Sequence, residues 1–236
     1  MSNNQFSMNT LPVEALIEAQ REFMLKVYAW MVGGLMTTAL TALAAVSSTD
    51  LMVAIWGNTI LRWVVILAPV GLVLLISGMI DRLSAAAASA LFILYAALVG
   101  LMLSMIFLVY EPSSIVTTFF VTAGTFGAMS IYGWVTKRDL SSMGSFLMMG
   151  LIGIIIASVV NIFLASSALY FAVSVIGVLV FTGLTAYDTQ RLKEEYVLGS
   201  EATAVGKKAA ILGALSLYLN FINLFLFLLR LLGSRR

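Results

Sequence analysis

Residues 140–187 read LSSMGSFLMMGLIGIIIASVVNIFLASSALYFAVSVIGVLVFTGLTAY, a stretch without a single formally charged side chain. A helix that crosses a bilayer needs about 20 mainly apolar residues, so this stretch is long enough for two crossings. We expect helices at about 145–164 and 168–188, joined by a turn at Ala165-Ser166-Ser167. Two adjacent apolar helices of this length indicate that the protein is surrounded by lipid.

The charged residues elsewhere in the chain delimit five more apolar segments. The proline in Glu111-Pro112-Ser113-Ser114 lacks a backbone donor, and the serines can cap the helix that follows. The stretch Leu51–Ile60 is too short to span. We therefore predict an all-α integral membrane protein with seven transmembrane helices. Residues 1–26 would form an N-terminal segment and 27–236 a single domain, with the other spans at about 27–46, 63–80, 85–110, 115–135 and 209–229.

The composition supports a membrane protein and excludes much chemistry. Hydrophobic residues make up 61% of the 236 residues and charged residues 10%, against about 25% charged in a typical soluble domain. The mean hydropathy is +1.06. Without His or Cys the chain has no Ser-His-Asp or Cys-His nucleophile, zinc site, iron–sulfur cluster or His-ligated haem. We expect no enzyme activity and no cofactor, and the nearly balanced net charge of +2 predicts no nucleic-acid partner.

Lysine and arginine predict the orientation, because they are enriched in cytoplasmic loops. With a cytoplasmic N-terminus, most basic residues lie inside: Arg21, Lys26, Arg82, Lys137, Arg138, Arg191, Lys193, Lys207 and Lys208. Arg62 then lies outside, and so do Arg230, Arg235 and Arg236, which conflicts with the rule. Residues 1–26 lack the apolar core of a cleaved signal peptide, so we expect the first span to act as its own anchor.

Polar residues within the predicted spans are the candidates for function. Asp188 ends the apolar run, and Ser216, Asn220 and Asn223 share one face of the last helix. An ionisable group in a membrane span suggests function. The alternative is an interfacial carboxylate paired with Arg191 or Lys193, and position alone favours neither. Counted along the helices, Asp188 lies about a turn nearer the cytoplasm than Asn220, so a contact would require tilt or unwinding.

Four strings, in order along the chain, carry a family resemblance. They are residues 26–35 (KVYAWMVGGL), 136–141 (TKRDLS), 183–190 (GLTAYDTQ) and 214–225 (ALSLYLNFINLF). With the predicted seven spans, the chain resembles the Bax inhibitor-1 family, most closely its bacterial inner-membrane members. The match covers about residues 20–236.

The resemblance implies a fold, an activity and site residues. It implies that the seventh helix is central and is wrapped by helices 1–3 and 4–6. It also implies a pH-responsive cation leak, with calcium the best-supported ion. In that family the pH sensor is a pair of aspartates on helices six and seven. Asp188 matches the first aspartate, and Asn220 replaces the second. The family also has an arginine near the inner end of helix two that can pair with the two aspartates, and Arg82 is the nearest candidate for it in this chain. Ser216 and Asn223 would support this polar face.

The replacement at Asn220 has a chemical consequence. Two neighbouring carboxyls share a proton and titrate as a pair, whereas a carboxamide does not titrate. We therefore expect a leak with little pH response, or a silent pore. Calcium prefers six or more oxygen ligands, so Asp188 would be a weak contact and no metal would bind tightly. The alternative function is a non-transporting protein that modulates other membrane proteins, such as a membrane AAA protease.

Overall fold

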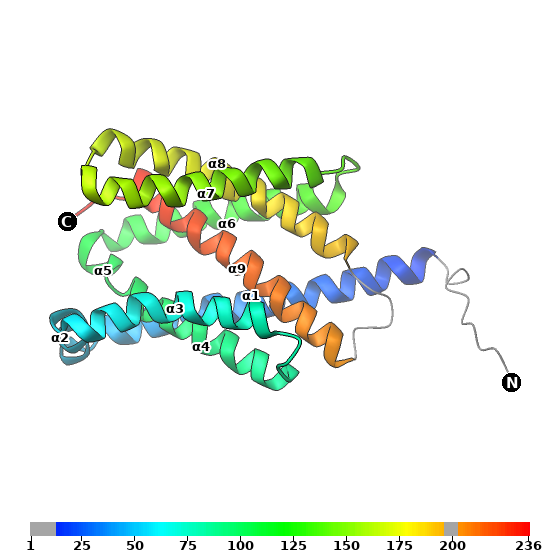
Figure 1. Ribbon diagram of the computed structural model, residues 1–236, viewed down its shortest axis with the longest axis horizontal. Coiled ribbons are helices and arrows are strands. Elements are labelled where there is room, and N and C mark those ends of the chain that lie inside the picture. The colour runs from blue at the N-terminus through cyan, green and yellow to red at the C-terminus, as the bar shows by residue number, and fades with distance from the viewer. Residues whose placement is uncertain (1–12, 196–202) are drawn as a thin grey trace, which may run out of the picture.

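Each long apolar stretch is helical in the computed structural model, which describes residues 13–195 and 203–236. Helices suit a bilayer because they satisfy their backbone hydrogen bonds within the segment. As predicted, seven helical segments in the described ranges are long and apolar enough to cross a membrane. Figure 1 shows α1 (Val13–Val46), α2 (Thr49–Gly57), α3 (Thr59–Met79), α4 (Ala85–Leu103), α5 (Ile106–Val109), α6 (Pro112–Val135), α7 (Ser141–Leu164), α8 (Ser167–Glu194) and α9 (Ala204–Leu232).

The first helix begins much earlier than the predicted start near residue 27. Residues 1–12 of the predicted N-terminal segment lie outside the described residues, but from Val13 onward that segment is already part of α1. It is amphipathic: Phe23 and Met24 are buried, while four charged side chains face outward, namely Glu18, Arg21, Glu22 and Lys26. Hydropathy counting missed this part of the helix because only one face is apolar.

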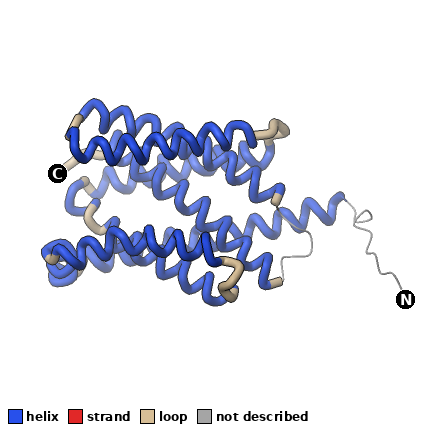
Figure 2. The backbone as a smooth tube through the Cα atoms, in the orientation of Figure 1, coloured by secondary structure: helices blue, strands red, loops and turns tan. Residues whose placement is uncertain are grey.

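The connections between the helices lie near the charged, proline and serine residues that predicted them. Pro112 opens α6, and Leu51–Ile60 forms no span, since α2 ends at Gly57 and α3 starts at Thr59. The predicted third span is broken after Leu103 and continues as α5. Ala165 adopts a left-handed conformation with φ of 48° at the turn between α7 and α8. The described part of the chain contains no strand (Figure 2).

Helix α9 is the centre of the bundle, as the resemblance implied. It runs obliquely between a group formed by α1–α4 and a group formed by α6–α8 (Figure 1). It packs directly against α1, α4, α6 and α8. The other helices expose many large apolar side chains, including Ile60, Phe163 and Leu179. In a membrane protein these side chains contact lipid.

A hydroxyl chain fixes the middle of α9 to the α1–α4 group. Tyr218 is fully buried, and its hydroxyl lies 2.6 Å from Thr38 Oγ1 on α1. The Thr38 hydroxyl donates onward to the Ala96 carbonyl of α4 at 2.9 Å, so Tyr218 is the donor to Thr38. Phe92 and Tyr95 of α4 contact the Tyr218 ring edge-on. Polar and aromatic contacts together hold three helices at one depth.

The two ends of α9 are also attached. Near its start, Lys208 Nζ donates to the carbonyls of Ile80 and Asp81 at 3.0 and 3.2 Å. Beyond its end, the tail pairs with the segment before α6: Glu111 N donates to Ser234 O, and Arg236 N donates to Val109 O, each at 3.0 Å.

The basic tail residues have local partners. Arg236 lies 3.7 Å from Glu111, Arg235 lies over the Tyr110 ring, and Arg230 lies over Tyr170. Burial raises the pKa of Tyr110, which keeps the phenol protonated beside Arg235. The start of α1 and the C-terminus lie at opposite ends of the bundle (Figure 1). The tail therefore has a structural use that explains its charge, independently of the orientation rule.

Close backbone approach between α6 and α8 depends on Gly133. A Cβ at this position would overlap the Ala186 carbonyl oxygen and would lie 3.0 Å from the Ala186 carbonyl carbon and Cα. Ala186 is fully buried and precedes Asp188 by two residues. This crossing therefore sets the position of the part of α8 that carries Asp188.

We predict that Gly133→Ala destabilises the protein. Overpacking of this kind costs about 1–3 kcal/mol, which lowers the melting temperature in detergent by several degrees. The matched control is Gly153→Ala on α7, where an added Cβ meets nothing within 4 Å. Equal melting temperatures for the two variants would contradict the proposed close approach.

Candidate functional site

Asp188 lies inside α8 rather than at its end. The helix continues to Glu194, about 9 Å further along the axis. Only 6% of the residue is exposed. An aspartate at this position needs partners from the protein, because lipid offers none.

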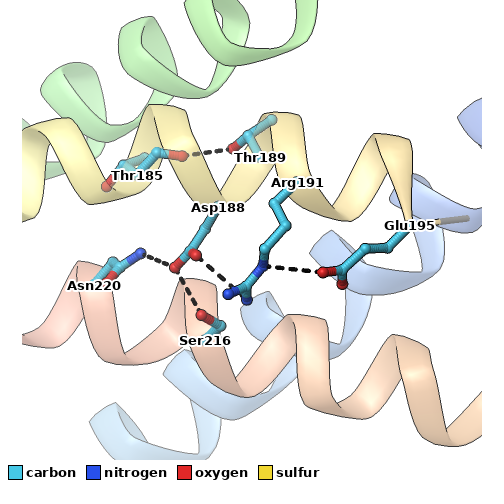
Figure 3. Close-up of polar contacts among 7 residues, drawn as sticks. All are labelled: Thr185, Asp188, Thr189, Arg191, Glu195, Ser216 and Asn220. Atoms are coloured by element: carbon cyan, nitrogen blue, oxygen red, sulfur yellow. Dashed lines mark hydrogen bonds and ion pairs between the residues drawn. The ribbon is translucent and has the colours of Figure 1, made fainter. Parts of the chain in front are cut away.

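Three side chains supply those partners (Figure 3). Ser216 Oγ and Asn220 Nδ2, both on α9, each donate to Asp188 Oδ2 at 2.7 Å. The guanidinium of Arg191, one turn further along α8, lies 3.3 Å from Asp188 Oδ1. One carboxylate oxygen thus binds the two neutral donors, and the other faces the cation. We call these four residues the Asp188 cluster.

Arg191 connects the buried carboxylate to the surface. Its side chain is 39% exposed, and its Nε lies 3.7 Å from Glu195 Oε1, within ion-pair range but beyond hydrogen-bond distance. The guanidinium also lies 5.7 Å from the centre of the Tyr187 ring. Arg191 therefore lies between two carboxylates, one buried and one exposed (Figure 3).

The tilt of α9, without unwinding, brings Asn220 to Asp188. Both helices are continuous through the contact. Helix α9 starts at Ala204, earlier than predicted, and runs obliquely through the bundle beside α8 (Figure 1). Residues at different distances from the helix ends therefore meet.

Two of the predicted site residues lie apart from the cluster. Arg82 is exposed in the connection between α3 and α4, and the cation beside Asp188 is Arg191 instead. Asn223 donates to the Leu219 carbonyl of its own helix at 2.8 Å. The hydroxyls of Thr185 and Thr189 likewise bond to α8 carbonyls.

Gln190 is a positioning residue that sequence reasoning missed. It is buried; its Oε1 accepts from Leu140 N at 2.9 Å, and its Nε2 donates to Arg138 O at 2.8 Å. It thereby fixes the connection between α6 and α7 to α8, two residues from Asp188. The sequence signal was a polar amide following Asp188 in an otherwise apolar helix, but its partners lie about 50 residues away.

In the Asp188 cluster, the negative charge of the carboxylate is balanced by Arg191. A carboxylate with two donors and one cation can bind a different cation when Arg191 moves away. It provides too few oxygens for tight calcium binding. Within the described residues no group of three or more acidic side chains comes together to hold a metal.

Comparison with known proteins identifies the family. The family model described as "Inhibitor of apoptosis-promoting Bax1" matches residues 20–236, which include the whole cluster. The chain belongs to the Bax inhibitor-1 family. Three bacterial relatives illustrate how much of the chain the similarity covers.

Each of these Bax inhibitor-1 relatives is matched along most of its length. "Inner membrane protein YbhL" of Escherichia coli K12 is 53% identical, covering 91% of this chain and 92% of the relative. An uncharacterized protein of Borreliella burgdorferi is 47% identical, covering 92% and 94%. Uncharacterized protein YrjE of Lactococcus lactis is 38% identical, covering 89% and 90%.

We predict that Asn220→Leu destabilises this Bax inhibitor-1 protein more than Asn223→Leu. The first removes a hydrogen bond to a buried carboxylate, a bond of the kind that contributes about 1.5–3 kcal/mol. The second removes a bond to a carbonyl of its own helix, which contributes about 1 kcal/mol. Thermal unfolding of both variants in one detergent measures the difference. A larger loss for Asn223→Leu would show that the Asn220 bond is not a main support of the cluster.

Proposed function

We propose that this protein is a passive cation leak of the bacterial inner membrane, with calcium as its ion. The observation that carries the proposal is the Asp188 carboxylate, buried between α8 and the central α9 and neutralised by Arg191. Ionisable groups inside membrane bundles mark ion pathways. Membership of the Bax inhibitor-1 family and similarity to the Escherichia coli inner membrane protein YbhL support it further.

In this proposal Arg191 acts as a resident blocking cation. A passing ion reaches Asp188 when the guanidinium shifts toward Glu195, its second acidic partner. A single carboxylate with serine and amide oxygens binds calcium weakly. Weak binding favours passage, because an ion that binds tightly does not leave.

The proposed orientation places the N-terminus in the cytoplasm. The loops and helix ends on the side where α1 starts carry most of the basic residues, as the positive-inside rule requires. The basic residues of the opposite end include Arg230, Arg235 and Arg236, which have aromatic or acidic partners there. In this orientation Asp188 lies in the cytoplasmic half of the bundle.

We predict that Asp188→Asn lowers calcium efflux from proteoliposomes. The loss of a charge-assisted contact of about 1.5–3 kcal/mol lowers the rate about tenfold or more. Arg191→Gln should raise efflux, because it removes the blocking cation. Asp139→Asn is the control, since Asp139 is exposed and binds Ser141 of its own segment.

The wild-type result also separates the two functional classes. Calcium efflux no faster than from empty liposomes would reject the leak. It would favour a non-transporting protein that binds and modulates other membrane proteins, such as a membrane AAA protease.

A second prediction concerns pH. Asn220→Asp places two carboxyls side by side, and such a pair shares a proton at lower pH. As pH rises the proton is released, and two negative charges then face the single cation Arg191. Calcium efflux by the variant should therefore increase with pH, whereas wild-type efflux stays nearly constant. Identical pH profiles of the wild type and the variant from pH 5 to 8 would refute this role of Asn220.

A further inference from the structure

A crevice of about 440 Å³ lies between α1 and α6, in the half of the bundle where α1 starts. It falls within the usual size range of small-molecule pockets, about 300–1,000 Å³. Its walls are mainly apolar. From α1 they include Met24, Leu25 and Tyr28, and from α6 they include Gly127, Ser130 and Trp134. The crevice is partly open to the outside of the bundle.

The mouth of the crevice is positively charged. Arg21 lines it, and within the described residues its acidic contact is Glu18 on the same exposed helix face, at 3.8 Å. Exposed pairs of this kind contribute about 0–1 kcal/mol, so Arg21 can turn to another anion. Lys193 Nζ lies 5.1 Å from the Trp134 ring centre and donates to the Trp134 carbonyl. In the described part of the chain Lys193 has no carboxylate partner.

The wall of the crevice contains a buried hydroxyl group that is free to form a hydrogen bond. The hydroxyl oxygen of Ser130 is buried and has no hydrogen-bond partner among the residues that the structure describes. Ser130 lies one helical turn, about 6 Å, deeper than Trp134. Rotation about its single side-chain torsion lets the hydroxyl donate to an acceptor below the charged mouth.

A second crevice on the other half of the same seam lacks these features. It has a volume of about 380 Å³, and its lining is apolar except for Thr38, which is already bonded to Ala96 and Tyr218. It offers neither a cation nor a free hydroxyl. Of these two crevices, the one at the Arg21 end therefore has a cation and an unbonded hydroxyl in its wall.

We propose that this crevice binds one anionic phospholipid. One acyl chain lies between α1 and α6, an ester carbonyl accepts from Ser130, and the phosphate lies between Arg21 and Lys193. The arrangement matches the order of groups in a phospholipid: anion at the interface, esters below it and hydrocarbon deepest. Trp134 at the mouth is typical of the membrane interface.

Charge, rather than apolar area, makes the site selective. A chain that moves from bulk lipid into the crevice gains little hydrophobic free energy, because lipid tails are as apolar as the protein walls. The gain comes from two cations facing one phosphate. A zwitterionic lipid with the same chains fills the space equally well but adds a positive charge near the mouth.

Native mass spectrometry of the purified full chain in mild detergent tests the site. The protein is titrated with palmitoyl-oleoyl phosphatidylglycerol and, separately, with the phosphatidylcholine of identical chains. The first phosphatidylglycerol should bind about tenfold more tightly, which corresponds to about 1.4 kcal/mol. The double variant Arg21→Gln and Lys193→Gln should bind both lipids alike.

Two glycines of α6 provide a matched pair for the chain-binding part. Gly127 lines the crevice and Gly124 does not, and an added Cβ meets nothing within 4 Å at either position. Gly127→Leu should weaken the binding of the first phosphatidylglycerol molecule about tenfold, while Gly124→Leu leaves this affinity unchanged. The melting temperatures of the two leucine variants show whether each folds. If Gly127→Leu does not fold, the Arg21→Gln and Lys193→Gln double variant, which changes only polar side chains, tests the site instead.

Several outcomes would overturn the proposal. Equal affinity of the wild type for the two lipids would reject headgroup recognition. Equal effects of the two leucine substitutions would reject the crevice as the location. A dimer that Gly127→Leu abolishes, with no change in phosphatidylglycerol binding, would show that a second copy of the chain occupies it.

Discussion

The protein must neutralise the Asp188 carboxylate with its own side chains, because a bilayer core supplies no water to solvate a charge. This requirement determines the geometry around it. Arg191 has to lie one turn away on the same helix, and α9 has to approach closely enough for Ser216 and Asn220 to donate to one oxygen. The oblique path of α9 and the glycine crossing of α6 with α8 both serve that approach.

The lipid environment also explains which parts of the fold could be predicted. Long uncharged runs, proline and capping serines marked the seven spans, and the family resemblance placed the last helix at the centre. The start of α1 was missed because residues 13–26 are apolar on one face only. The break after Leu103 was missed because apolar side chains continue on both sides of it.

The candidate site was only partly predictable, for a geometric reason. Asp188 and Asn220 were identified by residue type, but their contact depends on helix tilt, which counting residues along a helix does not give. Arg82 was assigned to the site by resemblance and lies apart from it, whereas the pairing with Arg191, one of the alternatives read from the sequence, forms through i,i+3 spacing on one helix. Gln190 could not be assigned, because its partners belong to a connection distant in sequence.

The attachments of α9 restrict how this bundle can move. Lys208 holds one end to the α3–α4 connection, the tail holds the other to the segment before α6, and Tyr218 fixes the middle to α1 and α4. A piston-like slide or a roll of α9 would break all three at once. The α6–α8 group has fewer such ties to α1–α4, so the lower-energy motion is a rocking of that group about α9. Such a motion would stretch the bonds that Ser216 and Asn220 of α9 donate to Asp188, whereas the Arg191 contact lies within α8 and moves with it.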